Sequence, residues 1–127
     1  MINSENVRGA KIFVTGADGF IGSHLVEKLA TLGATVKCLC QYNSEGNIGN
    51  LNELPKDILS NIEIVFGDIR DRSLIGRQVQ GFENIFHLAS LISIPHSYVA
   101  PQSYVDTNIS GTLNLLEEVK TRPIRRL

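Results

Sequence analysis

The sequence has almost no net charge and no long apolar run, and each shortage excludes a class of protein. Its 127 residues include 12 basic and 13 acidic side chains, for a formal net charge of −1. That balance gives no general attraction to nucleic acid or to an acidic membrane surface. No stretch approaches the roughly 18 apolar residues of a membrane span, and no apolar signal core is present. We therefore expect a cytoplasmic protein that binds neither nucleic acid nor membrane.

Cysteine is also scarce, since Cys38 and Cys40 are the only two. Their C-x-C spacing lies in an apolar run, where a strand would direct both side chains to one face. We interpret them as buried free thiols, which indicates a reducing compartment.

With 43% hydrophobic and 20% charged residues, the chain suits one globular unit, and we expect a single domain over residues 1–127.

Short β-branched runs alternate with helix-patterned stretches along the chain. Strands are predicted at Lys11–Thr15, Thr35–Cys40, Ile62–Phe66 and Asn84–Leu88. Helices are predicted at Phe20–Leu32, Asp71–Val79 and Val105–Lys120, with Asp71 as an N-terminal cap and Gly33 as a C-terminal cap. The two longer helices each carry apolar residues at spacings of four, four and three, namely Ile21, Leu25, Leu29 and Leu32, then Val105, Ile109, Leu113 and Leu116.

Polar and proline-containing segments separate these elements. Residues 41–61 are expected to form a long loop with at most one helical turn, and a second loop holds Pro95 and Pro101. Residues 124–127 resemble the start of a fifth strand. Strand, helix, strand runs this short join parallel strands. The predicted fold class is therefore α/β, a Rossmann-type doubly wound parallel sheet that is truncated after about four strands and incomplete at its C-terminal end.

A G-x-x-G-x-x-G pattern stands between the first strand and the first helix, formed by Gly16, Gly19 and Gly22. Gly16 would let the chain turn sharply, Gly19 would let a pyrophosphate approach the backbone, and Gly22 would let the helix pack closely. Free N–H groups at the helix start would bind the phosphates. No Gly-Lys-Ser/Thr follows, which excludes a triphosphate-binding Walker A loop. The pattern predicts dinucleotide binding, with Asp18, Phe20 and Ile21 in the same loop.

The choice between NAD and NADP stays open. An acidic residue about 20 positions further on would favour NAD, and a nearby arginine would favour NADP. Here the second strand ends in uncharged polar groups instead, and Gln41, Tyr42 and Asn43 are the candidates for contact with the adenosine ribose.

Four motifs in order resemble the extended short-chain dehydrogenase/reductases, which include NAD(P)-dependent nucleotide-sugar epimerases and 4,6-dehydratases. They lie at residues 14–24 (VTGADGFIGSH), 67–71 (GDIRD), 86–89 (FHLA) and 104–116 (YVDTNISGTLNLL). Residues 42–44 and 91–101 are most similar to the dehydratases acting on UDP-N-acetylglucosamine-type sugars.

The resemblance implies roles for residues beyond the glycine loop. Asp68 and Ile69 would contact the adenine ring, and Thr107 would lie near the nicotinamide ribose. The path of the cofactor would be lined by Leu88, Ala89 and Ser90. Asn108 would brace its helix and stay outside the site.

The pair that performs proton transfer in this family, a tyrosine with a lysine four residues later, is missing. The ammonium would lower the phenol's pKa, but Tyr42, Tyr98 and Tyr104 are followed at that spacing by glycine, glutamine and asparagine. The three histidines, His24, His87 and His96, have no ligand-spaced partner, so we predict no metal site.

Two functions remain open. The first is the dinucleotide-binding half of a nucleotide-sugar 4,6-dehydratase (a lyase) or epimerase, inactive alone, whose full-length form removes a hydride from the sugar C4 and returns it. The second is a non-catalytic NAD(P)-sensing or protein-interaction module. An open sheet edge and uncovered helix faces would in either case favour a homodimer or self-association.

Overall fold

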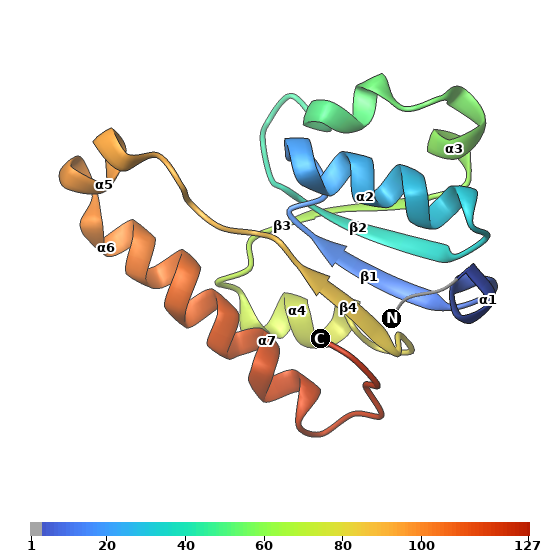
Figure 1. Ribbon diagram of the computed structural model, residues 1–127. Coiled ribbons are helices and arrows are strands. Elements are labelled where there is room, and N and C mark those ends of the chain that lie inside the picture. Colours follow the sequence, from blue (N-terminus) through green and yellow to red (C-terminus); the bar gives the residue numbers. More distant parts are fainter. Residues whose placement is uncertain (1–3) are drawn as a thin grey trace.

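Four parallel strands form one sheet in the order β3–β2–β1–β4. The structure, a computed structural model, describes residues 4–127 (Figure 1). The strands are β1 (Lys11–Thr15), β2 (Thr35–Gln41), β3 (Glu63–Gly67) and β4 (Asn84–His87). This arrangement confirms the predicted Rossmann-type sheet, with every strand within one residue of its expected bounds.

The central strands are apolar because both of their faces are covered. In β1, Ile12 and Val14 belong to one core cluster and Phe13 to the other, and all three are at most 3% exposed. Cys38 and Cys40 lie together in the first cluster as buried free thiols, as predicted. Period-two alternation thus assigns each side chain to one of two cores.

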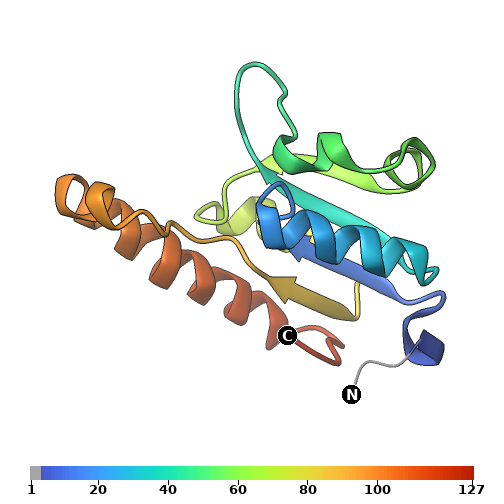
Figure 2. The ribbon, with the colours of Figure 1, turned by 45° about the horizontal axis from the view of Figure 1, so that its top comes forward.

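Each face of the sheet has its own helices (Figures 1 and 2). One side carries α2 (Phe20–Thr31), with α1 (Ser4–Val7), the 3₁₀ helix η1 (Gly49–Glu53) and α3 (Lys56–Ser60). The other carries α4 (Arg72–Gln78) and α7 (Thr112–Val119). The two layers leave the carboxyl ends of the strands open.

The predicted caps are confirmed. The Asp71 carboxylate accepts a hydrogen bond from the Leu74 amide at 3.0 Å, satisfying a free N–H at the start of α4. Gly33 has φ +88° directly after the C-cap of α2, a conformation that favours glycine.

The prediction of a loop between β4 and the last long helix is wrong. That segment contains α5 (Ile94–Val99) and α6 (Pro101–Tyr104). Pro95 and Pro101 lie in the first turns of these helices, where the missing N–H is not needed. Residues 41–61 likewise hold both η1 and α3, more helix than the single turn expected.

The last long helix has the opposite face buried from the one predicted. It runs from α6 through a π-helical segment, η2 (Val105–Gly111), into α7 (Figure 1). The predicted apolar residues form an exposed row, called here the outer stripe, in which Val105, Ile109, Leu113 and Leu116 are 43, 63, 54 and 42% exposed. The buried residues are Gly111 and Leu115. A Cβ at Gly111 would lie 2.7 Å from an Ile69 methyl group, so glycine permits this close packing.

Two smaller expectations have different outcomes. Ile21, assigned to the buried stripe of α2, is 68% exposed, because Gly22 and Ser23 face the core in the first turn instead. At the other end of the chain, residue 126 forms a parallel bridge with Asn84, and the Arg126 carbonyl accepts the Ile85 amide at 3.0 Å. The pairing expected for a fifth strand therefore begins there, beside β4.

Candidate dinucleotide-binding site

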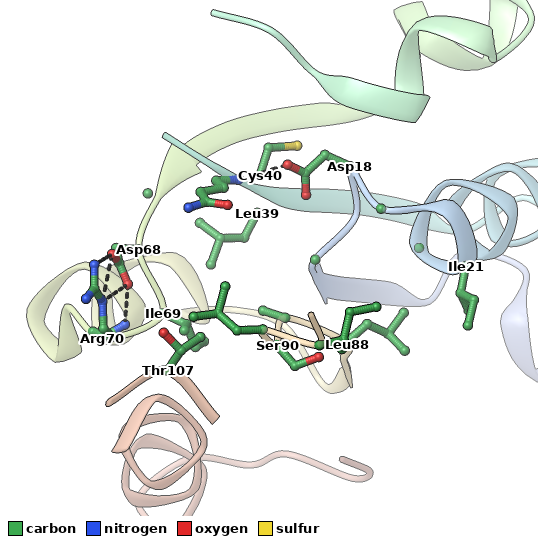
Figure 3. A pocket seen from close by; sticks show the side chains of 18 of the residues that line it. Asp18, Ile21, Leu39, Cys40, Asp68, Ile69, Arg70, Leu88, Ser90 and Thr107 are labelled. Atoms are coloured by element: carbon green, nitrogen blue, oxygen red, sulfur yellow. Dashed lines mark hydrogen bonds and ion pairs between the residues drawn. The ribbon is translucent and has the colours of Figure 1, made fainter. Parts of the chain in front are cut away.

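A cavity of about 790 Å³ opens at the carboxyl ends of the strands, between the segments that follow β1 to β4 (Figure 3). This edge of a parallel sheet is where ligands of α/β proteins bind. The cavity is lined by these residues of the predicted cofactor site: Gly16, Asp18, Gly19, Phe20, Ile21, Gly22, Gln41, Asp68, Ile69, Leu88, Ala89, Ser90 and Thr107. Tyr42 and Asn43 are not among its walls. Four separate sequence motifs thus meet at one place.

Two of the three loop glycines are required by the fold itself. Gly16 has φ +67°, and a Cβ there would lie 2.7 Å from the Ala89 amide nitrogen. A Cβ at Gly22 would lie 2.1 Å from the Gly16 carbonyl oxygen. Gly22 therefore lets the helix pack against its own loop rather than against the sheet. Both positions exclude a side chain without any ligand.

Gly19 is different, because nothing in the described protein requires glycine there. Its φ of −75° is open to any residue. A Cβ would meet only the Gly16 carbonyl oxygen, at the ordinary contact distance of 3.4 Å. The space above Gly19 belongs to the cavity, so a group that enters the cavity can approach the backbone closely.

The start of α2 faces the same space with unused backbone donors. The first intrahelical bond runs from the Ser23 amide to the Gly19 carbonyl at 2.9 Å, and no side chain caps the helix. The amides of Phe20, Ile21 and Gly22 precede that bond and have no partner within the helix. Together with the positive end of the helix dipole, they form a site for an anion.

The carboxylate of Asp18 lies at the end of β2, where its Oδ2 accepts the Gln41 amide at 3.2 Å. Its backbone is held by η1, because the amide and side-chain nitrogens of Asn50 both donate to the Asp18 carbonyl, at 3.0 and 3.2 Å. The Tyr42 side chain is 70% exposed and does not line the cavity. The Asn43 side chain bonds the backbone of Gln41 and Asn47. Of the three residues predicted at this strand end, Gln41 lines the cavity, while Tyr42 and Asn43 do not.

Asp68 and Arg70 form an ion pair at the end of β3 (Figure 3). The Arg70 Nε lies 2.9 Å from both carboxylate oxygens. Hydrogen bonding from the guanidinium holds the pKa of Asp68 below its usual value. The pair is close to neutral overall and borders the cavity without adding net charge.

Behind the cavity wall, Thr15 and His87 belong to a directional hydrogen-bond network. The Thr15 hydroxyl accepts the Leu88 and Ala89 amides, both at 3.2 Å, and lies 2.7 Å from His87 Nδ1. A hydroxyl has two lone pairs and one hydrogen, so Thr15 donates to Nδ1. We therefore assign the proton of the neutral imidazole to Nε2, which donates to Thr112 Oγ1 at 2.9 Å. Burial lowers the pKa of His87, which favours this neutral form.

Asn108 completes the support of the segment after β4. Its side chain accepts the Leu91 amide at 2.8 Å and donates to the Leu91 carbonyl at 2.9 Å. The Asn108 carbonyl in turn accepts the Thr112 hydroxyl at 2.7 Å. As expected, Asn108 is a brace outside the cavity, although it holds this segment rather than the sheet.

Sequence reasoning missed part of the cavity wall. The additional lining residues are Leu39, Cys40, Gly67, Arg70, Leu91, Ile92, His96 and Ser103. Several end or follow a parallel strand, a position that could have suggested them. Burial, with the nearby Asp18 charge, raises the pKa of Cys40 to about 12, which favours the protonated thiol.

Residues 4–127 hold no group of three or more side chains that suits a metal ion. Over the same residues, no helix has the length and apolar character needed to cross a membrane.

The family model for GDP-mannose 4,6 dehydratase matches residues 13–126, and the chain therefore belongs to this family of nucleotide-sugar dehydratases and epimerases. UDP-glucuronate 4-epimerase 1 of Arabidopsis thaliana is 36% identical over 116 residues, 88% of this chain and 27% of its own length. UDP-glucose 4-epimerase of Neisseria meningitidis serogroup B is 39% identical over 114 residues, 86% of this chain and 32% of its own.

Solved structures agree with this family. The dTDP-glucose 4,6-dehydratase DesIV of Streptomyces venezuelae, with NAD and TYD bound, superposes with a TM-score of 0.77 at 32% identity. The match covers 90% of this chain and 37% of DesIV. The chain thus spans about a third of the length of the relatives it matches.

Proposed function

We propose that this chain is the dinucleotide-binding part of a nucleotide-sugar 4,6-dehydratase or epimerase. One observation carries the proposal: Gly19 is the one glycine of the loop that the fold does not require. The absence of a side chain there has a reason if a pyrophosphate comes close to the backbone. The cavity and the unpartnered amides of α2 supply the space and the donors for it.

The residues present fit NAD or NADP. The amides of Phe20, Ile21 and Gly22 would hold the pyrophosphate, Asp68 and Ile69 would border the adenine, and Thr107 would border the nicotinamide ribose. The bound cofactor would supply a hydride acceptor. The chain's own contribution is to bind and orient the cofactor, with the Thr15–His87–Thr112 network fixing the cavity wall at Leu88 and Ala89.

Catalysis needs groups that these 127 residues do not hold. The chain has no tyrosine followed four residues later by lysine, so we propose that it is inactive alone, with residues 1–127 as one cofactor-binding domain. A nucleotide sugar would be the substrate of the full-length enzyme, as the names of the relatives suggest. The buried free thiols fit the reducing environment of the cytoplasm.

A second function, protein interaction, is favoured by the outer stripe. Four large apolar residues, 42–63% exposed, occupy one side of the helix. Such a row suits contact with another protein surface, including a second copy of this chain. We therefore propose self-association or a homodimer as the second property of the chain.

The cofactor proposal is tested by replacing Gly19 with valine. The Cβ would meet only the Gly16 carbonyl oxygen, at 3.4 Å, and the side chain would lie next to the phosphate donors, so Gly19→Val should leave the melting temperature within a few degrees. The affinity for NAD, measured by calorimetry, should fall at least about tenfold. Unchanged affinity in a folded variant would overturn the proposal.

A further inference from the structure

We infer that Asp18 selects NAD over NADP, taking the role that an acidic residue at the end of the second strand would otherwise have. This inference rests on the proposed dinucleotide function and deepens it. The sequence has no acid at the expected place, since β2 ends in Gln41 and Tyr42 follows. The structure brings a carboxylate to that place from the glycine-rich loop.

The position of the carboxylate is fixed on two sides. Its Oδ2 accepts the amide of Gln41, the last residue of β2, at 3.2 Å. Its backbone carbonyl accepts both nitrogens of Asn50. A Cβ at Gly49 would lie 2.6 Å from the Asp18 carbonyl oxygen, so η1 packs tightly on this residue. Figure 3 shows the side chain beside Leu39 and Cys40, at the β2 side of the cavity.

This is the place where the adenosine ribose lies when a pyrophosphate occupies the start of the first helix. The hydrogen bond to Gln41 is the one bond of the Asp18 carboxylate within residues 4–127. The group therefore keeps acceptor capacity for a ribose hydroxyl, which NAD offers at the 2′ position. NADP has a phosphate there, which would place two anionic groups side by side.

Within residues 4–127, no unpaired lysine or arginine on the cavity wall offsets that repulsion. Among the described residues that line the cavity, the charged ones are Asp18, Asp68 and Arg70. Arg70 is bound to Asp68 through Nε and Nη2, so its charge is already neutralised. The charge left over is the negative charge of Asp18.

The test compares NAD with NADP on the full 127-residue chain by calorimetry. Wild type should bind NAD about tenfold more tightly or better, which is the size of effect expected for a hydrogen bond to a charged group. Asp18→Asn keeps the shape and an acceptor for the Gln41 amide but removes the charge, and should bring the two dissociation constants within about twofold. Asp57→Asn, an exposed carboxylate outside the cavity, is the matched control and should retain the wild-type preference.

Salt supplies a readout that a merely structural role of Asp18 would not change. The preference of wild type should shrink as ionic strength rises from about 50 mM to about 500 mM, whereas that of Asp18→Asn should stay constant. Equal binding of both dinucleotides by wild type, or an Asp18→Asn variant that keeps the preference, would overturn the inference and leave the proposed function intact. Tighter binding of NADP that is lost in Arg70→Gln would overturn it in favour of Arg70. Absence of binding by either dinucleotide would contradict the proposed function itself.

Discussion

The two long helical regions, α2 and the η2–α7 helix, carry the same apolar spacing but use it in opposite ways. In α2, Leu29 is buried and Leu25 and Leu32 pack against the core. In η2–α7, every member of the outer stripe is exposed, and the helix packs through Gly111 and Leu115. Spacing therefore predicts that a helix forms but not which face the protein buries. The face that carries Gly111 is buried because glycine lets the helix approach Ile69 closely.

The largest effect is expected for Gly22→Ala, in the first turn of α2, where the helix packs against its own loop. Its Cβ would lie 2.1 Å from the Gly16 carbonyl oxygen, and backbone cannot move away as a flexible side chain can. We expect the free energy of unfolding, measured with denaturant, to fall by about 3 kcal/mol or more. Gly81→Ala, where a Cβ meets no atom within 4 Å but φ is +83°, should cost only about 1 kcal/mol. Equal losses would show that the contact at Gly22 does not matter.

The corresponding test of the second helix compares neighbours on opposite faces. Leu115 is fully buried, and Leu115→Ala should lower the unfolding free energy by about 3 kcal/mol. Leu113 is 54% exposed, and Leu113→Ala should change it by no more than about 0.5 kcal/mol. Thermal melts followed by circular dichroism measure both. A larger loss for Leu113 would mean that the outer stripe is covered in solution.

The network behind the cavity wall joins β1 to the η2–α7 helix, since Thr15 is the last residue of β1 and Thr112 is the first residue of α7. Thr15→Val keeps the shape of the side chain but leaves the Ala89 amide and His87 Nδ1 without their partner, while the Leu88 amide keeps its bond to the Thr15 carbonyl at 3.1 Å. We expect a loss of about 2 kcal/mol. Thr15→Ser retains the hydroxyl and should recover most of that loss. A stable Thr15→Val variant would contradict the contribution to stability assigned to these hydrogen bonds.

His87 should make stability depend on pH. Burial lowers its pKa in the folded protein, so the unfolded chain binds the proton first as pH falls below about 6.5. The unfolded state then holds more protons, and the stability contributed by neutral His87 declines between pH 7.5 and 5.5. Denaturant titrations across this range should show a slope of at most about 1 kcal/mol per pH unit. The slope should be smaller in His87→Gln.

Much of the fold followed from local sequence rules. Strands were predictable because runs such as Lys11–Thr15 are apolar on both faces, and the caps at Asp71 and Gly33 were predictable from residue chemistry. The helices α5 and α6 were missed because Pro95 and Pro101 are compatible with a helix start as well as with a loop. The π-helical geometry of η2 has no local pattern that distinguishes it from an α-helix.

The candidate site was predictable where a motif sets backbone geometry and less so where tertiary packing places a side chain. The three glycines identified the loop, but only the structure separates Gly19 from Gly16 and Gly22. Asp18 was named as a loop residue, yet its approach to Gln41 depends on how η1 packs against it. Tyr42 and Asn43 follow β2 but do not line the cavity, and the Asn43 side chain instead makes hydrogen bonds within its own loop.

The most direct test of the central claim follows the backbone amides of the protein during titration with NAD in a ¹H–¹⁵N correlation spectrum. The amides of Phe20, Ile21 and Gly22 should show the largest shifts, since these donors would contact the pyrophosphate, while those of the outer stripe should stay in place. Shifts confined to other residues, or an unchanged spectrum at millimolar NAD, would contradict the account.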